Sequence, residues 1–330
     1  MKKIVVIKGS SLGDILTGIP MLKSLKKHWP DSRISLVHGY EGNGIGLIKS
    51  SPYIDKDVII NFSMAGFRTL LKLRGERPDI VIDAFPNTRA SSLLSLFLGA
   101  PIRASYRNPR NAASFVYNIM VEPIGDAIEL EGRILQKLGI AGTDKMEIDV
   151  PRNCEKIAKS GLLIGINPGK DGNFCRTWTE ENWTLLIKEI RKKYQCTIIL
   201  LGGRDNAASG EYIERNSVNV INLIGKTDID GLICAINQCD AFISINGGPM
   251  HVAAALSKPQ IALNGPSLEE WNPHNPNAIC LGGRKFCSTR CNDNGCHYGD
   301  ARCIKTITPA QVMEKLELLI GKPPTGPPRF

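Results

Sequence analysis

A glycine turn between a strand and a helix is the stretch of this sequence best suited to hold an anion. The segment INGGPMHVAAAL, at 245–256, follows an apolar run, and its Gly247 and Gly248 precede an alanine-rich helical stretch. Glycine leaves the backbone open to close approach, and the first N–H groups of a helix lack partners within the helix. The stretch therefore predicts a phosphate or diphosphate site. A tight turn without a ligand is the alternative that it leaves open.

A carboxylate ends a second turn of small residues, near the N-terminus. The run KIVVIK, at 3–8, is typical of a strand buried on both faces, and GSSLGD leads from it to Asp14. Ligands of α/β proteins bind at the carboxyl ends of such strands, and a carboxylate there can take the proton from an attacking hydroxyl group. Aspartate is also a favoured helix cap. Asp14 is therefore either a general base or the cap of a helix that begins at Ile15.

Strand-like and helix-like segments alternate on both sides of a connecting stretch at 138–160. The first half predicts strands within 3–8, 33–39, 56–61, 78–85 and 102–106, and helices within 15–30, 40–52, 64–74 and 87–100. The second half predicts strands within 162–169, 196–203, 219–225, 241–245 and, as the last strand, 260–265, with helices within 178–194, 228–239, 247–258 and 309–320. Thr179 is the expected N-cap of the first of these helices. This alternation predicts an α/β fold with doubly wound parallel sheets.

The connecting stretch and the length of the chain predict two domains. A chain of 330 residues suits two domains of about 150 residues each. We expect them at 1–150 and 151–320, both Rossmann-like, with the Pro/Gly-rich segment 321–330 as a flexible tail. Facing carboxyl edges of two such sheets would form a cleft in which two substrates can meet.

Positive charge is concentrated in the first half of the chain. The net charge is +9, and 23–110 contain 14 Lys and Arg against 7 Asp and Glu. This surplus favours an anionic partner such as a phosphate-bearing lipid or a membrane surface, although a solvated face without a partner has the same pattern. An aromatic content of 6% and the lack of a recognisable motif argue against nucleic-acid binding. No apolar run reaches the roughly 18 residues that span a bilayer, and the N-terminus is typical of a buried strand, so we expect a cytoplasmic protein.

Several motifs occur in an order and spacing that resemble a known family. They are KGSSLGDILTGIPML at 8–22, NPG at 167–169, RTW at 176–178, LLGG at 200–203 and INGGPMHVAAAL at 245–256. From Lys3 to Leu319 the chain resembles the ADP-heptose:lipopolysaccharide heptosyltransferases, which are glycosyltransferase family 9 enzymes of the GT-B fold.

The resemblance implies an inverting, metal-independent transfer of a heptose, or a related sugar, from an ADP-sugar donor to a lipopolysaccharide core or a related glycan acceptor. It implies that catalysis requires no cofactor. The implied partners are a nucleotide sugar and an anionic glycolipid acceptor, with peripheral contact at the inner face of the cytoplasmic membrane.

The resemblance assigns the donor to the second domain. Arg176 stands where the family has a lysine that contacts the donor phosphates, and Asn246 stands where it commonly has an aspartate near the donor sugar. Because Asn246 lacks that charge, the identity of the donor sugar is left open. The developing charge on the leaving diphosphate would be met by N–H groups and by Arg176. The expected donor residues are Asn167, Pro168, Gly169, Arg176, Gly202, Gly203, Asn246, Gly247, Gly248, Pro249, Met250 and His251.

The resemblance also makes Asp14 the catalytic base and assigns the acceptor to the first domain. Arg103 and Arg110 lie in an arginine-rich stretch that could hold phosphates or acidic sugars. A solvated surface is the alternative for this stretch. The expected acceptor residues are Ser11, Gly13, Asp83, Asn87, Arg89 and Arg107.

The ten cysteines form one cluster and a scattered set. The spacing within the cluster differs from the paired C-x2-C of common zinc sites, so a structural zinc, a disulfide and free thiols remain alternatives. The cluster consists of Cys287, Cys291, Cys296 and Cys303. The scattered set is expected to fill the core as small side chains, and consists of Cys154, Cys175, Cys196, Cys234, Cys239 and Cys280.

Two other functions fit parts of the pattern. Tandem α/β domains also suit a nicotinamide-dependent oxidoreductase, but the GNGIG segment at 42–46 lacks the G-x-G-x-x-G spacing and does not follow the first strand. A non-catalytic relative, or one that uses another nucleoside diphosphate sugar, is compatible with Asn246. The presence of Asp14 favours an enzyme.

Overall fold

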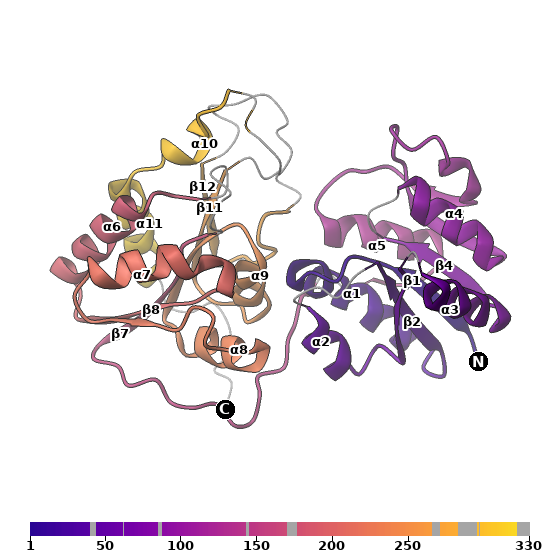
Figure 1. The fold of residues 1–330 in the computed structure, drawn as a ribbon, viewed down its shortest axis with the longest axis horizontal. Helices are drawn as coiled ribbons and strands as arrows, with labels where there is room; N and C mark the ends of the chain where they lie inside the picture. The colour runs from indigo at the N-terminus through magenta and orange to yellow at the C-terminus, as the bar shows by residue number, and fades with distance from the viewer. Residues whose placement is uncertain are drawn as a thin grey trace. The chain divides into compact units, whose positions relative to one another are not determined.

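The structure is a computed structural model, and the chain divides into two compact units, Met1–Glu147 and Ile148–Phe330 (Figure 1). The residues it describes are 1–39, 44–61, 63–84, 88–142, 145–169, 177–265, 271–282, 296 and 298–321. Each unit is a parallel sheet with its own helices. Among the described residues, no helix is long and apolar enough to cross a membrane.

The sheet of unit 1 has six strands in the order β3-β2-β1-β4-β5-β6. The strands are β1 (Lys3–Ile7), β2 (Arg33–His38), β3 (Lys56–Ile59), β4 (Ile80–Asp83), β5 (Ile102–Tyr106) and β6 (Ile119–Val121). The helices are α1 (Leu12–His28), α2 (Ile45–Ser50), α3 (Met64–Gly75), α4 (Arg89–Leu98) and α5 (Ala127–Lys137), with a 3-10 turn η1 (Ser114–Val116). The direction in which strands are added reverses between β1 and β4, and such a switch point is where open α/β sheets bind ligands.

Both faces of this sheet are covered, which explains the uninterrupted apolar character of β1. Val5 and Ile7 pack in one cluster with Leu73 of α3 and Leu98 of α4. The alternate residues of β1 point to the other face and are also buried. Right-handed crossovers place α1 on that second face, where it packs against α5.

The sheet of unit 2 repeats this topology in the order β12-β11-β10-β7-β8-β9. The strands are β7 (Leu162–Asn167), β8 (Cys196–Leu200), β9 (Val220–Asn222), β10 (Ala241–Ile245), β11 (Gln260–Asn264) and β12 (Ala278–Gly282). The helices are α6 (Glu180–Lys193), α7 (Ala207–Arg215), α8 (Ile229–Gln238), α9 (Gly248–Ala255), α10 (Arg302–Lys305) and α11 (Pro309–Ile320), with a 3-10 turn η3 (Arg204–Asn206). The rings of Trp178 and Trp183 meet edge to face at 4.8 Å in its core.

Most of these elements could be predicted from the sequence, and several others are added by the structure. Thr179 caps α6 as predicted, its side chain accepting from the N–H of Asn182. The structure adds β6, η1, α5, α7 and α10, which the sequence did not predict. It also adds β12, which follows β11, the predicted last strand. β6 has three residues, too few for a periodicity to show. α5 was missed although Ile128, Ile134 and Leu135 are spaced as on one face of a helix, so this element could have been predicted.

Three of the scattered cysteines are not simple core residues, which corrects the expectation for them. Cys154, in the segment that enters unit 2, forms a disulfide with Cys234 of α8, which corrects the expectation for both. Cys280 is exposed, whereas Cys196 and Cys239 are buried as expected. Cys175 lies outside the described residues. The disulfide could not be predicted from the sequence, because the bonded cysteines are 80 positions apart in the chain.

Candidate functional site

The turn between β1 and α1 holds the side chain of Asp14 close to its own backbone. Ser11 is the N-cap of α1, with φ −67° and ψ 156°, and its Oγ accepts from the Asp14 N–H at 3.3 Å. The same hydroxyl donates to Asp14 Oδ2 at 2.6 Å. The helix therefore begins at Leu12 and not at Ile15, and the cap is Ser11. The alternative in which Asp14 is the helix cap is wrong.

Gly9 is required for this position of the carboxylate. A Cβ atom at Gly9 would lie 2.1 Å from Asp14 Oδ2 and 2.7 Å from its Cγ, so any side chain there would displace the carboxylate. Asp14 is only 8% exposed. It lies in the first turn of α1, just beyond the carboxyl end of β1, at the switch point of the sheet. A negative charge in the first turn of a helix interacts favourably with the helix dipole.

A buried ion pair lies beside this turn. Lys8, the residue after β1, donates to Glu131 of α5, and the two residues are 4% and 2% exposed. Gly18 of α1 makes room for the lysine, since a Cβ there would lie 2.7 Å from Lys8 Cε. Burial raises the pKa of Glu131, the charge and hydrogen bond of Lys8 oppose that rise, and the charge of Asp14 adds to it. This pair could not be predicted from the sequence, because its members are 123 positions apart in the chain.

The glycine turn of unit 2 lies at the carboxyl end of β10, as predicted. Gly247 is the N-cap of α9 and Pro249 is in its first turn. Gly247 is extended, with φ 176°, and a Cβ there would meet only the Ile245 carbonyl oxygen, at 4.0 Å. The space beside the turn is therefore open. The side chains of Met250 and His251 are buried, with 0% and 4% exposure, so the backbone of the first turn is what α9 presents to an anion.

Asn246 is built into a network of amides at the same edge. Its Nδ2 donates to Asn264 Oδ1 at 3.3 Å and to the Trp271 carbonyl oxygen at 2.9 Å. Asn264, which ends β11, in turn donates its Nδ2 to Asn272. Asn246 and Asn264 are 8% and 6% exposed. The local structure thus requires a donor at position 246, which a carboxylate cannot supply.

Aspartate at position 246 is therefore expected to destabilise unit 2. The carboxylate of Asn246→Asp would face two oxygen acceptors, and we expect the free energy of unfolding to fall by about 2–3 kcal/mol. Urea unfolding at neutral pH measures this change. Asn216→Asp is the matched control, because Asn216 is exposed while its Nδ2 also donates to a carbonyl oxygen, at 2.8 Å. Equal stability of the two variants would contradict the requirement for a donor.

Residues 67–301 match the family described as glycosyltransferase family 9 (heptosyltransferase). This chain belongs to glycosyltransferase family 9. It is 25% identical to lipopolysaccharide heptosyltransferase 2 of Escherichia coli K12, over 96% of this chain and 98% of that protein. It is 23% identical to a lipooligosaccharide heptosyltransferase 2 of Campylobacter jejuni, over 94% of this chain and 95% of that protein.

Solved structures agree with this assignment at the level of the fold. The ADP-heptose lipopolysaccharide heptosyltransferase II of E. coli superposes with a TM-score of 0.74 at 22% identity, covering 97% of this chain and 98% of that one. A family 9 glycosyl transferase of Veillonella parvula gives a TM-score of 0.78 at 22% identity, covering 97% of both chains. The predicted family, the two-domain α/β fold and the glycosyltransferase class are confirmed.

Other expected donor residues of this family 9 enzyme have structural partners. Asn167 Nδ2 donates to the Leu201 carbonyl oxygen at 2.8 Å, and the Pro168 carbonyl oxygen accepts from Trp183 Nε1 at 3.1 Å. Gly202 leaves room for Asn167, because a Cβ there would lie 2.9 Å from Asn167 Nδ2. Gly169 has a φ of 117° and Gly203 precedes η3. Arg176 lies outside the described residues.

Asp83 lies at the carboxyl end of a strand, as predicted, and its side chain is held by a chain of hydrogen bonds. It ends β4, beside Ile7 in the sheet, and it is 0% exposed. Tyr117 donates to its Oδ2, and Ser92 Oγ lies 3.0 Å from the Tyr117 hydroxyl. Asn111 extends this chain of contacts by donating to Ser92 Oγ at 2.8 Å. Asp83 is thus fully buried and hydrogen-bonded in this structure, and its expected contact with the acceptor stays a prediction.

Burial, together with the Asp83 carboxylate, raises the pKa of Tyr117 well above its usual range, so the phenol stays a proton donor. The sequence analysis missed Tyr117, Ser92 and Asn111. Only Tyr117, a polar aromatic residue beside a short apolar strand, carried a signal that could have suggested a buried partner.

Some of the remaining acceptor candidates of the enzyme are exposed, and others have side chains that already bind partners within unit 1. Arg103 donates to the carbonyl oxygens of Val116 and Ala100, at 2.7 and 2.6 Å, which makes it a structural residue. Arg107 pairs with Glu122 on the surface, at 2.8 Å. Arg89, Arg110 and Gly13 are at least partly exposed, and Asn87 lies outside the described residues.

The cysteine cluster is only partly described. The described part of the chain contains no group of three or more residues arranged to ligate a metal. Cys287 and Cys291 lie outside it, so the zinc alternative stays a prediction. Cys303 is buried, and Cys296 Sγ accepts from the Ala301 N–H at 3.4 Å.

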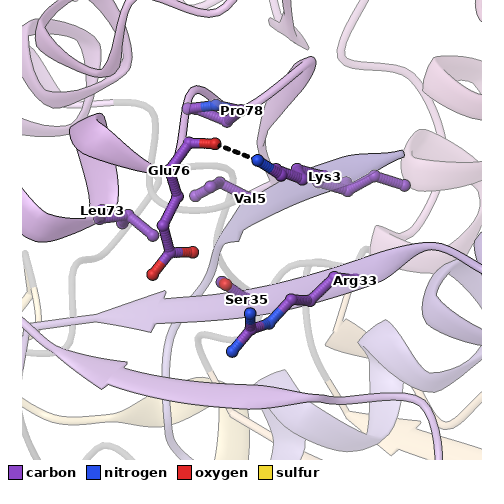
Figure 2. A pocket seen from close by; sticks show the side chains of 8 residues that line it. Lys3, Val5, Arg33, Ser35, Leu73, Glu76 and Pro78 are labelled. Carbon is purple, nitrogen blue, oxygen red and sulfur yellow. Dashed lines mark hydrogen bonds between the residues drawn. The ribbon is translucent and has the colours of Figure 1, made fainter. Parts of the chain in front are cut away.

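A small pocket of unit 1 lies away from these residues (Figure 2). Its lining includes Lys3, Arg33 and Pro78, from the amino ends of β1, β2 and β4. The Lys3 ammonium donates to the Glu76 carbonyl oxygen across it, at 2.7 Å. Asp14 follows the opposite, carboxyl end of β1. The pocket is therefore not part of the predicted site.

Proposed function

We propose that this chain transfers a heptose, or a related sugar, from an ADP-sugar to a lipopolysaccharide core or a related glycan, with inversion and without a metal ion. The observation that carries the proposal is the placement of Asp14. Ser11 and Gly9 hold its carboxylate at the carboxyl end of the central strand of unit 1. Support comes from family 9 membership and from the names of the relatives, one of which was solved as an E. coli heptosyltransferase with ADP-2-deoxy-2-fluoro heptose.

Asp14 would act as the general base. As the acceptor hydroxyl oxygen attacks the anomeric carbon, its proton passes to the Asp14 carboxylate. The new C–O bond forms on the face opposite the leaving group, and the bond from the anomeric carbon to the diphosphate breaks, which inverts the configuration. Ser11 Oγ, which donates to Asp14 Oδ2 at 2.6 Å, leaves the carboxylate's other oxygen to accept the proton.

Unit 2 would bind the nucleotide sugar through the turn at Gly247. The open space beside this turn and the N-terminus of α9 suit the diphosphate, whose charge grows as the sugar departs. Arg176 would add a positive charge from its place in the family motif. Asn246 presents an amide where the family resemblance implies that a carboxylate is common, so we assign the donor sugar only to heptose or a close relative of it.

Unit 1 would bind the acceptor, an anionic glycolipid, with the enzyme working at the inner face of the cytoplasmic membrane. Arg89, Arg107 and Arg110 are exposed on this unit and suit acidic groups on the acceptor. Catalysis in this proposal requires no cofactor.

Thermal unfolding with nucleotides tests the donor assignment. ADP at about 100 times its dissociation constant should stabilise the folded enzyme by about 2.7 kcal/mol, which corresponds to a rise in Tm of roughly 5–10 °C for a unit of this size. UDP and GDP should give clearly smaller rises. A preference for UDP or GDP would overturn the ADP assignment.

Gly247→Ala is the matched variant for this experiment. Position 247 is extended and open, so alanine should fold as well as glycine does. The new methyl group should instead obstruct the diphosphate and remove most of the ADP-induced rise. An unchanged rise would show that ADP binds elsewhere.

A further inference from the structure

We infer that unit 1 docks on an anionic membrane surface through the solvent-facing sides of α3 and α4, and we call this the α3–α4 face. It consists of Met64, Phe67, Arg68, Leu71, Lys72, Arg74, Arg89, Leu93, Leu96 and Phe115. The inference rests on the proposed function only for the location of the acceptor at a membrane. The exposure and charge of the face carry the rest.

Helix α3 presents its apolar residues to solvent and not to the core. Among its residues only Gly66 and Leu73 are buried. Met64, Phe67 and Leu71 are 71%, 50% and 46% exposed. Their spacing of three and four residues places them on one side of the helix, opposite Leu73. Burial in the unit therefore explains Leu73 but leaves this second apolar stripe unexplained.

Basic side chains flank the stripe on both sides. On a helical projection, Arg68 and Lys72 lie along one edge of it and Arg74 lies along the other, and α3 contains no acidic residue. Helices that lie in the plane of a membrane interface have this arrangement of an apolar strip with Lys and Arg at its margins. A helix that merely needed solubility would carry polar residues at the centre of its outer face.

Helix α4 extends the surface. It packs beside α3 (Figure 1), and the Arg74 guanidinium lies 4.9 Å from the centre of the Phe97 ring and donates to the Phe97 carbonyl oxygen at 2.6 Å. Leu93 and Leu96 of α4 are 59% and 48% exposed, on the same side of the helix as Arg89. Phe115, in the adjoining η1, is 82% exposed.

The charge around the face identifies the partner as anionic. The sequence from 84 to 121 contains four arginines and no acidic residue, and the sequence from 58 to 75 contains three basic residues and no acidic one. Anionic lipid attracts such a surface, and apolar side chains can enter the interface only where no carboxylate has to be desolvated. Nucleic acid would require a base-reading or stacking arrangement in place of long aliphatic side chains.

Vesicle binding tests the inference, with phosphatidylcholine vesicles that contain or lack phosphatidylglycerol. The full chain, without donor or acceptor, should co-sediment with the anionic vesicles and only weakly with the neutral ones. Its binding to the anionic vesicles should weaken as the salt concentration rises.

Double variants test which side chains of the face bind the vesicles. Arg68→Gln with Lys72→Gln should lower the partition coefficient about 30-fold, because the loss of each basic residue lowers it roughly fivefold. Phe67→Gln with Leu71→Gln should lower it at least about tenfold. All four side chains are exposed, so these variants should keep the Tm of the parent.

Matched controls come from the surface of unit 2. Leu185→Gln with Leu318→Gln removes two apolar side chains that are 50% and 48% exposed, and Lys192→Gln with Arg215→Gln removes two exposed charges. Both should bind vesicles like the parent. Equal losses in test and control variants, or binding to neither vesicle, would overturn the inference. The parent could instead fail to bind vesicles and form a concentration-dependent dimer that the Phe67 and Leu71 changes abolish. That result would assign the face to a second copy of the chain.

The catalytic proposal is tested separately from this surface. With a delipidated, water-soluble acceptor, the Phe67 and Leu71 variant should transfer sugar like the parent. Absence of transfer in the parent would reject the proposed function and leave the vesicle result standing. A loss of transfer in the variant alone would place the face in the acceptor site and overturn its assignment to the membrane.

Discussion

Substitution of Asp14 by asparagine is expected to lower the rate of sugar transfer at least about 100-fold while leaving the fold and ADP binding intact. A positioned general base contributes about 100- to 10,000-fold to such reactions, and asparagine cannot take the proton. The amide has the shape of the carboxylate, and its oxygen can still accept from Ser11 Oγ, which now lies 2.6 Å from Asp14 Oδ2. The turn at Ser11 should therefore survive the change.

Transfer of labelled sugar measures the effect, and the ADP-induced rise in Tm shows that the variant is folded. Asp126→Asn is the matched control, because Asp126 caps α5 in the same unit and accepts from the Glu129 N–H at 2.9 Å. It should retain most of the activity. Normal turnover of the Asp14 variant would remove Asp14 from the mechanism and leave it as a favourable charge in the first turn of α1.

Removal of Glu131 is expected to destabilise unit 1 more than any other single change considered. Glu131→Ala would leave Lys8 buried without its partner, and the loss of one member of a buried ion pair lowers the free energy of unfolding by about 3–5 kcal/mol. Hydrogen exchange of peptides from β1 and α1, compared with peptides from unit 2, measures this loss where it should occur.

The pair itself is not expected to be essential for stability. Lys8→Met combined with Glu131→Leu keeps apolar volume at both positions and removes both charges, so most of the lost stability should return. If the double variant is as unstable as Glu131→Ala, shape and not charge governs this region. A fully active, stable double variant would also show that the pair does not assist Asp14, whose charge acts on Glu131 in this structure.

The sequence was most informative at the ends of the central strands, where a short apolar run is followed directly by a turn that belongs to the predicted site. The runs that became β1, β7 and β10 are apolar and short, and each ends in a turn of small residues, so the strand ends and the turns at Asp14 and Gly247 could be predicted. The cap at Ser11 could also have been found, because Ser11 precedes Asp14 by three residues, the spacing of a capping box.

The contacts that the sequence did not reveal join residues far apart in the chain. Asp83 was named as an acceptor residue from the family resemblance, and the sequence did not show that it is buried and accepts from Tyr117, which lies 34 residues later. The pairing of Lys8 with Glu131 is a second such contact, because it joins the end of β1 to α5, 123 positions later in the chain. Periodicity describes one element at a time, whereas these contacts depend on how elements pack.

The strand order described for both sheets has a consequence for how the chain folds. In unit 1 Ile4 pairs with both Ile34 and Ile80, and in unit 2 Ile164 pairs with Ala241. Parallel neighbours of this kind cannot form from a local hairpin, so each central strand must wait for a partner that is synthesised much later. All strands of unit 1 precede Glu147, so its sheet can close on the ribosome before the first strand of unit 2 has emerged. The sheet of unit 2 cannot be completed until β10 is synthesised. Until then, the edge of β7 that pairs with β10 remains unpaired.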